Sequence, residues 1–427
     1  MKTLFKNATV YTMENENKGI IADILTENGL IAAVDKNINT DDAKVIDCAG
    51  LFAMPGLFDG HVHINSDEMH GYFIANGITS VRNMWGFPIQ QEWDKEVKEG
   101  KRVGPHLYST GPLIDAVEIW KGCYLVKTPE EAEKAVDVTI DGGWSYVKVY
   151  PSLPKDAMLA LMFRAKERGI RVVGHMAYNV SPRTLADLGY YCVEHTGCLP
   201  KSLDDIRYIA ESGMWHCPTQ MVENTLTEHV IAGKSLEDIP YIEYVSPRAK
   251  KRWMEVFTRW RTNYENGSPF YDDFKNPKEI PNRTSVFMLY SDNIILGTDT
   301  PNPGVIAGFS IHGELLEMVE RYGMSPYNAI KCGTVNAARH LGIENKKGKL
   351  KPGMDSDIVF YSKNPFEDIK NSICVETVVQ GINVYDKKKL EELKLTSKNR
   401  PDDEIVSTYK DDDEEASAGR DYIVREA

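Results

Sequence analysis

The chain has 427 residues, of which 42% are hydrophobic and 26% are charged. These proportions are typical of a folded globular protein and exclude a chain that stays disordered. The formal net charge of -13 disfavours nucleic acid as a partner, because an acidic surface repels phosphate groups.

The amino-terminal segment and the cysteines indicate the expected cellular location of the protein. Residues 1–7 contain no long apolar run, so we expect neither a secretory signal nor a membrane partner. The cysteines are odd in number and form no CxxC pair, which is typical of reduced thiols in a cytoplasmic protein. They are Cys48, Cys123, Cys192, Cys198, Cys217, Cys332 and Cys374.

Both ends of the chain carry short segments rich in β-branched and aromatic residues. An Asn28-Gly29 pair between two of these segments predicts a β-hairpin. We expect strands from both ends to pair into one small sheet domain made of residues 1–54 and 343–390. The strand-like segments are residues 3–13, 21–26, 30–34, 357–361 and 377–385.

The middle of the chain has a different pattern. Short apolar runs alternate with longer amphipathic stretches, which indicates parallel βα units. Eight such units predict an α/β protein with a closed (β/α)8 TIM barrel, over residues 55–342. The eight predicted strands are Gly56–Ile64, Ile78–Asn83, His106–Gly111, Tyr146–Tyr150, Arg171–Met176, Tyr191–Thr196, Trp215–Gln220 and Ile294–Asp299.

Two segments fall outside the repeating pattern. Residues 221–281 form a long connection before the last predicted strand, with Trp253, Phe257 and Trp260 on one side of a predicted helix. We expect an added helix packed on the barrel. The alternative is a lid, because long βα loops at the catalytic face carry function. Residues 391–427 are polar and acidic, which predicts a solvated tail.

Five metal-binding side chains stand at the ends of predicted strands. His61 and His63 are two residues apart, so in an extended strand both imidazoles point to one side and can bind one metal ion. The alternative for this pair taken alone is two ordinary surface or core histidines. His175, His195 and Asp299 each end an apolar run. The carboxyl ends of barrel strands meet on one face, so we expect all five to converge there.

Lys148 lies in the middle of the fourth predicted strand, between two valines. Burying an unpaired ammonium group is costly, so a lysine at this position needs a chemical reason. Desolvation lowers the pKa of a lysine and favours the neutral amine, which can react.

Seven short stretches together carry a wider resemblance, which covers most of residues 1–385. On these residues the chain resembles the amidohydrolase superfamily, and within it the imidazolonepropionase-like and prolidase-like branch. The resemblance implies that the two chain ends form a small discontinuous β-sandwich beside the barrel. The stretches are Met54–His63, Gly77–Met84, Tyr146–Tyr150, Val173–His175, Val193–Gly197, Gly297–Asp299 and Leu350–Val359.

The same resemblance implies a binuclear metal centre. The HxH pair and the aspartate are implied to bind one ion, and the two later histidines the other. The lysine, carboxylated by CO₂ to a carbamate, is implied to bridge both ions. Two divalent ions are thus expected, and histidine and carboxylate ligands favour Zn²⁺, with manganese, iron or cobalt as alternatives. The implied ligands are His61, His63, Lys148, His175, His195 and Asp299.

The resemblance also implies a hydrolase that cleaves an amide-type bond in a dipeptide, an N-acyl amino acid or a similar small molecule. A hydroxide bridging the two metal ions is the implied nucleophile, and Asp299 the implied general base that returns the proton to the leaving amine. We expect substrate contacts at Tyr150, Tyr178 and His312, with packed side chains as the alternative.

Other functions stay open. A cyclic amide, a lactone or another ester is attacked by the same chemistry. A deaminase is disfavoured, because deaminases of this superfamily are typically mononuclear and lack the carboxylated lysine. A non-catalytic scaffold is disfavoured because all six ligand positions are filled. The expected partner is a small-molecule substrate, and assembly into a homo-oligomer is left open.

Overall fold

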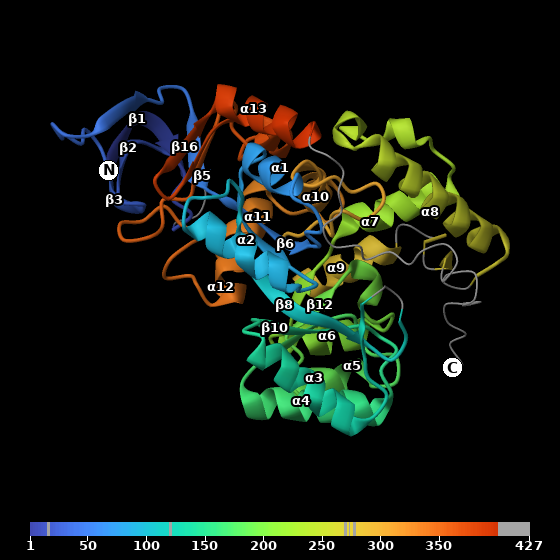
Figure 1. Ribbon diagram of the computed structural model, residues 1–427. Coiled ribbons are helices and arrows are strands. Elements are labelled where there is room, and N and C mark those ends of the chain that lie inside the picture. The colour runs from blue at the N-terminus through green and yellow to red at the C-terminus, as the bar shows by residue number, and fades with distance from the viewer. Residues whose placement is uncertain (15–17, 119–121, 269–270, 273, 276–278, 400–427) are drawn as a thin grey trace.

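The computed structural model describes residues 1–14, 18–118, 122–268, 271–272, 274–275 and 279–399 (Figure 1). Within these ranges, no helix combines the length and the apolar character needed to cross a lipid bilayer.

The predicted barrel is present as a ring of parallel strands, each paired with the next one along the chain. A short extra strand, β9 (Tyr124–Leu125), pairs with the end of β8. Strand β8 extends beyond the segment predicted for it. The barrel strands are β6 (Leu57–Val62), β7 (Ile78–Asn83), β8 (His106–Asp115), β10 (Tyr146–Val149), β11 (Arg171–Gly174), β12 (Cys192–Glu194) and β13 (Trp215–Cys217).

The eighth predicted strand, Ile294–Asp299, closes the ring without forming a regular strand. Isolated parallel bridges join it to β13 at Ile294 and to β6 at Thr300. The backbone ladder is interrupted because the Asp59 carboxylate accepts the backbone N–H of Thr298 at 2.9 Å. This segment was therefore correctly placed in the barrel but wrongly predicted as a full strand.

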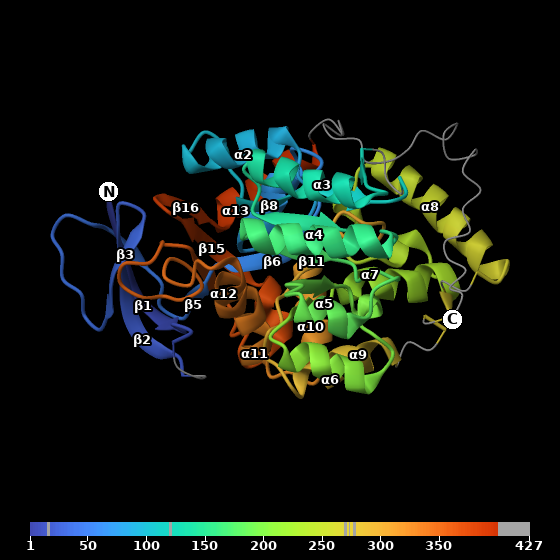
Figure 2. The ribbon, with the colours of Figure 1, turned by 90° about the horizontal axis from the view of Figure 1, so that it is seen from below.

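Helices follow most barrel strands and cover the outside of the ring (Figure 2). Several begin at a serine or threonine whose side chain accepts a backbone N–H of the first turn, as Thr128 does from Glu131. The helices around the barrel are α1 (Met69–Ala75), α2 (Pro88–Lys98), α3 (Pro129–Asp141), α4 (Lys155–Arg168), α5 (Pro182–Asp187), α6 (Leu203–Glu211), α9 (Glu279–Met288), α10 (Ser310–Glu320), α11 (Pro326–Lys331) and α12 (Ala337–Leu341).

The long connection after β13 contains the expected helix. It starts with α7 (Gln220–Thr225) and continues to α8 (Pro247–Glu265), which begins at the N-cap Ser246. Trp253 and Phe257 are buried and Trp260 is half-buried. The apolar side of α8 therefore packs against the rest of the protein, as the spacing of these aromatic residues predicts.

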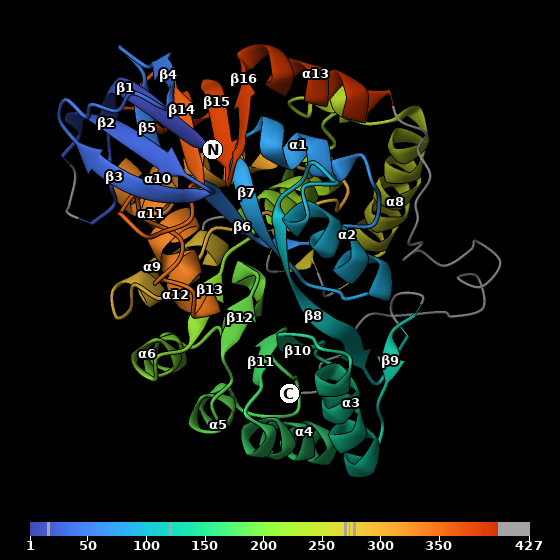
Figure 3. The same ribbon diagram turned by 60° about the vertical axis from the view of Figure 1, so that its left-hand side comes forward.

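Strands from both chain ends form a second sheet beside the barrel (Figure 3). Residues Asn28 and Gly29 have φ angles of 51° and 86°, so the predicted hairpin turn between β2 and β3 is confirmed. All eight strands join one hydrogen-bonded sheet rather than two. They are β1 (Lys2–Val10), β2 (Ile20–Glu27), β3 (Leu30–Asp35), β4 (Lys44–Asp47), β5 (Phe52–Pro55), β14 (Ile358–Tyr361), β15 (Val375–Gln380) and β16 (Asn383–Asp386).

The last described helix, α13 (Lys387–Lys398), packs on α1 (Figure 1). Asp386 is the N-cap of this helix, and the side chain of Leu390 in its first turns is buried. The expected start of the tail at residue 391 therefore falls inside a helix, because an N-cap and a buried leucine outweigh the polar composition of the segment. The rest of the predicted tail, residues 400–427, lies outside the described residues.

His70 in α1 predicts how acid affects stability. Its ring is buried against Trp93, its two nitrogens have no hydrogen-bond partner within the described ranges, and burial lowers its pKa from 6.5 to about 4. Below pH 6.5 the unfolded chain binds a proton that the folded protein excludes. The contribution of neutral His70 to the free energy of unfolding should therefore be complete above pH 6.5 and be lost as the pH falls toward 4.

We expect His70→Leu to flatten this part of the stability profile, measured as the free energy of unfolding in urea at several pH values. The change should be partial, because burial also lowers the pKa of His216 to about 4. Equal slopes in the variant and the wild type would contradict the assignment.

Candidate metal centre

The HxH pair and Asp299 meet at the carboxyl end of the barrel. The Nε2 atoms of His61 and His63 lie 3.3 Å and 3.0 Å from Oδ1 of Asp299. The backbone explains this convergence, because the Asp299 N–H donates to the His61 carbonyl and the His63 N–H donates to the Thr300 carbonyl, both at 2.7 Å. One ligand atom from each of the three side chains lies within 4.8 Å of the others.

His175 and His195 complete the histidine cluster. Their ring centroids are 4.6 Å apart, and the His195 ring lies 4.9 Å from that of His61. Gly174, just before His175, has a φ of 133°, and a Cβ there would lie 2.1 Å from the carbonyl oxygen of Val149. Only glycine therefore allows the chain to leave β11 at this angle and present the histidine.

Two residues of the cluster adopt an uncommon backbone conformation. His195 and Asp299 have φ angles of 66° and 64°, in the left-handed region that non-glycine residues rarely occupy. Such strain persists only where the surrounding structure enforces it, and it is common at functional sites.

Lys148 lies on β10 and is fully buried. It pairs in register with Val173 of β11, and its Nζ lies 5.5 Å from the centre of the Tyr150 ring, which itself contacts His175. No described residue provides a hydrogen-bond partner for Nζ. Burial lowers the pKa of Lys148, and the nearby carboxylates of Glu194 and Asp299 oppose this effect only in part. Its environment therefore favours the neutral amine.

Three histidines of the cluster, of which His61 is buried and the other two are half-buried, are neutral near pH 7. Burial lowers the pKa values of His61 and His175 well below 6.5 and that of His195 to about 3. A neutral imidazole keeps a free lone pair, which is the form that binds a metal ion.

The donor atoms of the cluster fit a site for divalent cations. Several of them are buried without a hydrogen-bond partner in the described structure, which is costly unless something else binds them. Nitrogen and carboxylate donors of this kind suit zinc and related ions. The unpartnered atoms are His61 Nε2, His63 Nδ1, Lys148 Nζ, His175 Nδ1 and Asp299 Oδ1.

A buried ion pair below the cluster orients His61. Glu194 on β12 accepts from His61 Nδ1 at 2.8 Å, and Nη2 of Arg82 on β7 donates to both Glu194 oxygens at 2.8 and 2.7 Å. Arg82 also donates to the Gly60 carbonyl and contacts His340. Burial acts to raise the pKa of Glu194, but the Arg82 guanidinium holds it below its ordinary value.

Glu194 and Arg82 were not found from the sequence. A signal was available for Glu194, a charged residue directly after the apolar Cys192 and Val193, whereas Arg82 lies on a strand that also contains other polar residues. His61, Glu194 and Cys217 also lie close enough together to hold a cation. However, both Glu194 oxygens are already bound, and burial raises the pKa of Cys217 well above its ordinary value, so its thiol stays protonated. This second group supports the site rather than binding metal.

His195 has its own supporting contact, which sequence reasoning also missed. Its Nδ1 lies 2.7 Å from Oγ1 of Thr219, whereas Oδ2 of Asp299 is 3.7 Å away. Thr219 has a φ of 49° and stands at the start of α7, where Glu314 accepts the backbone N–H groups of Gln220 and Met221. The hydrogen bond to Thr219 leaves the other ring nitrogen of His195 available as a ligand.

The expected substrate contacts fall in different places. Tyr150 is brought to the cluster, with its ring centroid 4.1 Å from that of His175. Tyr178 is exposed, and its backbone N–H donates to the Pro151 carbonyl near the same rim. His312 is not brought to the cluster. Its ring contacts Ser372 and Asn76, and Asn76 precedes β7 at the opposite, amino-terminal end of the strand.

Comparison with known proteins agrees with this fold. Residues 52–384 match the Amidohydrolase family, and the chain belongs to this family. Ochratoxinase from Aspergillus niger is 26% identical over 375 residues, which cover 74% of this chain and 71% of that protein.

Two solved structures share the fold. Bottromycin amidohydrolase has a TM-score of 0.75 at 20% identity, covering 93% of this chain and 91% of its own. A Xaa-Pro dipeptidase with bound methionine in the active site has a TM-score of 0.71 at 20% identity, covering 90% of this chain and 100% of its own.

Variants of Glu194 should distinguish its contribution to the stability of the protein from its contribution to metal binding. We expect Glu194→Gln to lower the free energy of unfolding by about 3–5 kcal/mol, because Arg82 is left buried without its counter-charge. The double variant Arg82→Met, Glu194→Leu should recover much of this loss, because no charge remains buried. Both variants should bind Zn²⁺ more weakly than the wild type, because glutamine offers His61 only a weaker, neutral acceptor and leucine offers none.

Urea unfolding and calorimetric titration with Zn²⁺ measure the two effects. A Glu194→Gln variant as stable as the wild type, or a double variant with wild-type zinc affinity, would contradict the supporting role of this pair.

Proposed function

We propose that the protein is a metal-dependent hydrolase that cleaves the amide bond of a small molecule such as a dipeptide or an N-acyl amino acid. The observation that carries this proposal is the cluster of four histidines with Asp299 and Lys148, several of whose buried donor atoms lack hydrogen-bond partners within the described structure. Membership of the Amidohydrolase family supports the reaction class.

The donor set supports two divalent ions, for which we propose zinc. His61, His63 and Asp299 would hold one, and His175 and His195 the other. We propose that the neutral amine of Lys148 adds to CO₂ and releases a proton, which forms an N-carboxylate. This change replaces a buried amine without a partner by an anionic group with two oxygens, and so offsets the charge of two cations.

When bound, the ions supply Lewis acidity toward the scissile carbonyl and lower the pKa of a coordinated water. The protein side chains provide the proton transfers. Asp299 is 5% exposed, and its carboxylate faces His61 and His63 through Oδ1 and His195 through Oδ2. A carboxylate held in this way can take the proton of the attacking water and pass it to the leaving nitrogen.

The relatives named above support the proposed substrate class. They include an ochratoxinase, an amidohydrolase and a dipeptidase with bound methionine in its active site. We propose that a free amino acid is one product here as well. The same side chains would serve hydrolysis of a cyclic amide, a lactone or another ester, so a test of the substrate must include these bonds.

The metal content tests the site directly. Wild-type protein loaded with zinc and bicarbonate should hold two ions per chain by elemental analysis, as expected for a two-metal hydrolase. Lys148→Ala should hold fewer ions and lose activity, and added short carboxylic acids should restore part of both. Lys155→Ala, an exposed lysine on α4, should behave as wild type. A wild-type protein that holds at most one ion contradicts the binuclear proposal.

The role of Asp299 is tested by an isosteric change. Asp299→Asn should keep the fold and lower kcat by about a hundredfold or more, because an amide cannot accept the proton. A library of dipeptides, N-acyl amino acids, cyclic amides and esters identifies the substrate for this measurement. Asp156→Asn, an exposed carboxylate on α4, serves as the control. A metal-loaded Asp299→Asn enzyme that works at the wild-type rate would exclude Asp299 as the base.

A further inference from the structure

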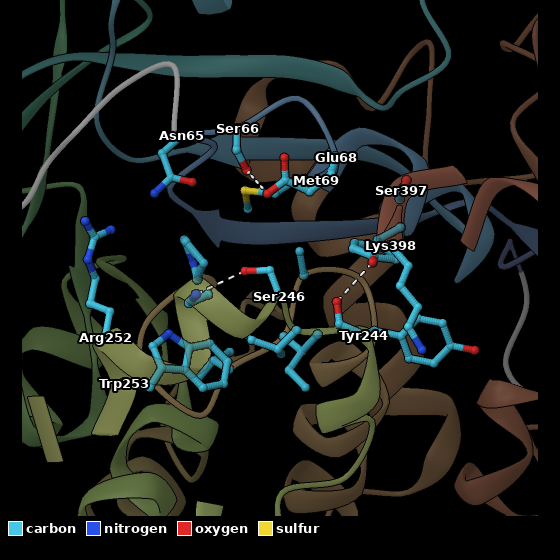
Figure 4. A pocket seen from close by; sticks show the side chains of 17 residues that line it. Asn65, Ser66, Glu68, Met69, Tyr244, Ser246, Arg252, Trp253, Ser397 and Lys398 are labelled. Carbon is cyan, nitrogen blue, oxygen red and sulfur yellow. Dashed lines mark hydrogen bonds between the residues drawn. The ribbon is translucent and has the colours of Figure 1, made fainter. Parts of the chain in front are cut away.

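A pocket opens on the side of the metal centre where β6 and the Asp299 segment end. Loop residues after His63 form one wall, residues 301 and 305–307 form another, and α8 and the end of α13 complete it (Figure 4). The space between these walls measures about 770 Å³, including the open solvent at its mouth.

The pocket lies within reach of a substrate bound at the metal centre. Asn65 and Pro301 both line it, and each is two residues beyond a metal-binding side chain, His63 and Asp299 respectively. Because one residue extends the chain by at most about 3.6 Å, each lies within about 7 Å of that ligand residue along the backbone. A group next to the scissile bond can therefore enter the pocket.

The walls of the pocket combine apolar surface with one polar side chain that lacks a partner. Asn65 is 7% exposed, no described residue hydrogen-bonds its side-chain amide, and Figure 4 shows this amide directed into the pocket. An amide that faces the pocket and has no protein partner offers both a donor and an acceptor to a polar group of a ligand. The apolar lining is formed by Met69, Trp253, Val305, Ile306 and Ala307.

We propose that this pocket binds the amine part of the substrate, as a hydrophobic amino acid whose side chain packs against Trp253 and whose polar groups bind Asn65. The inference rests on the proposed amide hydrolysis. Asp299, which would return the proton to the leaving nitrogen, belongs to the segment that lines the pocket. The leaving amine is therefore the part of the substrate nearest to it.

Filling the pocket tests this assignment. Ala249 lines it from the first turn of α8, so Ala249→Phe would occupy space without removing a core side chain. We expect kcat/KM for N-acetyl-phenylalanine to fall about tenfold or more, with a smaller change for N-acetyl-glycine. Varying the acyl group should affect Ala249→Phe and the wild type equally. Met254→Phe, at an exposed position of α8 that does not line the pocket, is the control.

Asn65→Ala should lower kcat/KM for both substrates, because the lost hydrogen bond does not depend on the size of the side chain. The assignment would be overturned if the loss of kcat/KM in Ala249→Phe depended on the acyl group of the substrate. An equal loss for the phenylalanine and the glycine substrates would also overturn it.

A binding measurement separates the pocket from the proposed reaction. Metal-loaded wild type should bind free phenylalanine more tightly than glycine in calorimetric titrations, and both Ala249→Phe and Asn65→Ala should lose most of this affinity. If no amide in the library is cleaved while this pattern holds, the proposed reaction fails and the pocket assignment stands. If phenylalanine binds no better than glycine, or binds Ala249→Phe as well as the wild type, the assignment is wrong.

Discussion

The geometry of the metal centre depends on one buried charge. Glu194 lies inside the barrel, where a carboxylate without partners would be highly unfavourable. Arg82 neutralises this charge and donates to both oxygens of Glu194, and His61 donates to one of the same oxygens. The ion pair therefore fixes which ring nitrogen of His61 faces the other ligands. It also ties β7 to β12 across the barrel, so the site and the barrel interior are stabilised by the same contacts.

This dependence extends outward through further hydrogen bonds. Asp59 holds Thr298, which positions the irregular segment that ends in Asp299. Thr219 holds His195 and is itself fixed at the start of α7, where Glu314 accepts two backbone N–H groups. Three residues of the cluster, His61, His195 and Asp299, are thus oriented by neighbours outside the proposed ligand set, as is common around metal sites.

Much of this arrangement could be predicted from local patterns. The Asn28-Gly29 turn and the strand Ile78–Asn83 follow from short-range preferences, and both are present as predicted. The five ligands at strand ends could be predicted to converge because a parallel barrel places the carboxyl ends of its strands together. The family resemblance then added the expected role of Lys148 as a carboxylated ligand. The structure buries this lysine without a hydrogen-bond partner among the described residues, as its position on an apolar strand suggests.

The rest depends on contacts between distant residues. The segment 294–299 has the composition of a strand, but a side chain from β6 replaces part of its backbone ladder. The pairing of Arg82 with Glu194 joins residues 112 positions apart. His312 follows Asp299 closely in sequence, yet its helix turns it toward the other end of the barrel. A local sequence pattern does not show whether a side chain such as His312 points toward the metal centre or away from it.

The sheet built from both chain ends has a consequence for how the protein is made. Strand β5 pairs with β14, so Met54 lies opposite Val359 in the finished sheet. During synthesis the edge of β5 stays unpaired until the ribosome has added some three hundred further residues, and exposed strand edges attract other chains. The barrel residues are made while this edge stays unpaired, so the sheet can be completed only late in synthesis, when the segment after the barrel joins the amino-terminal strands.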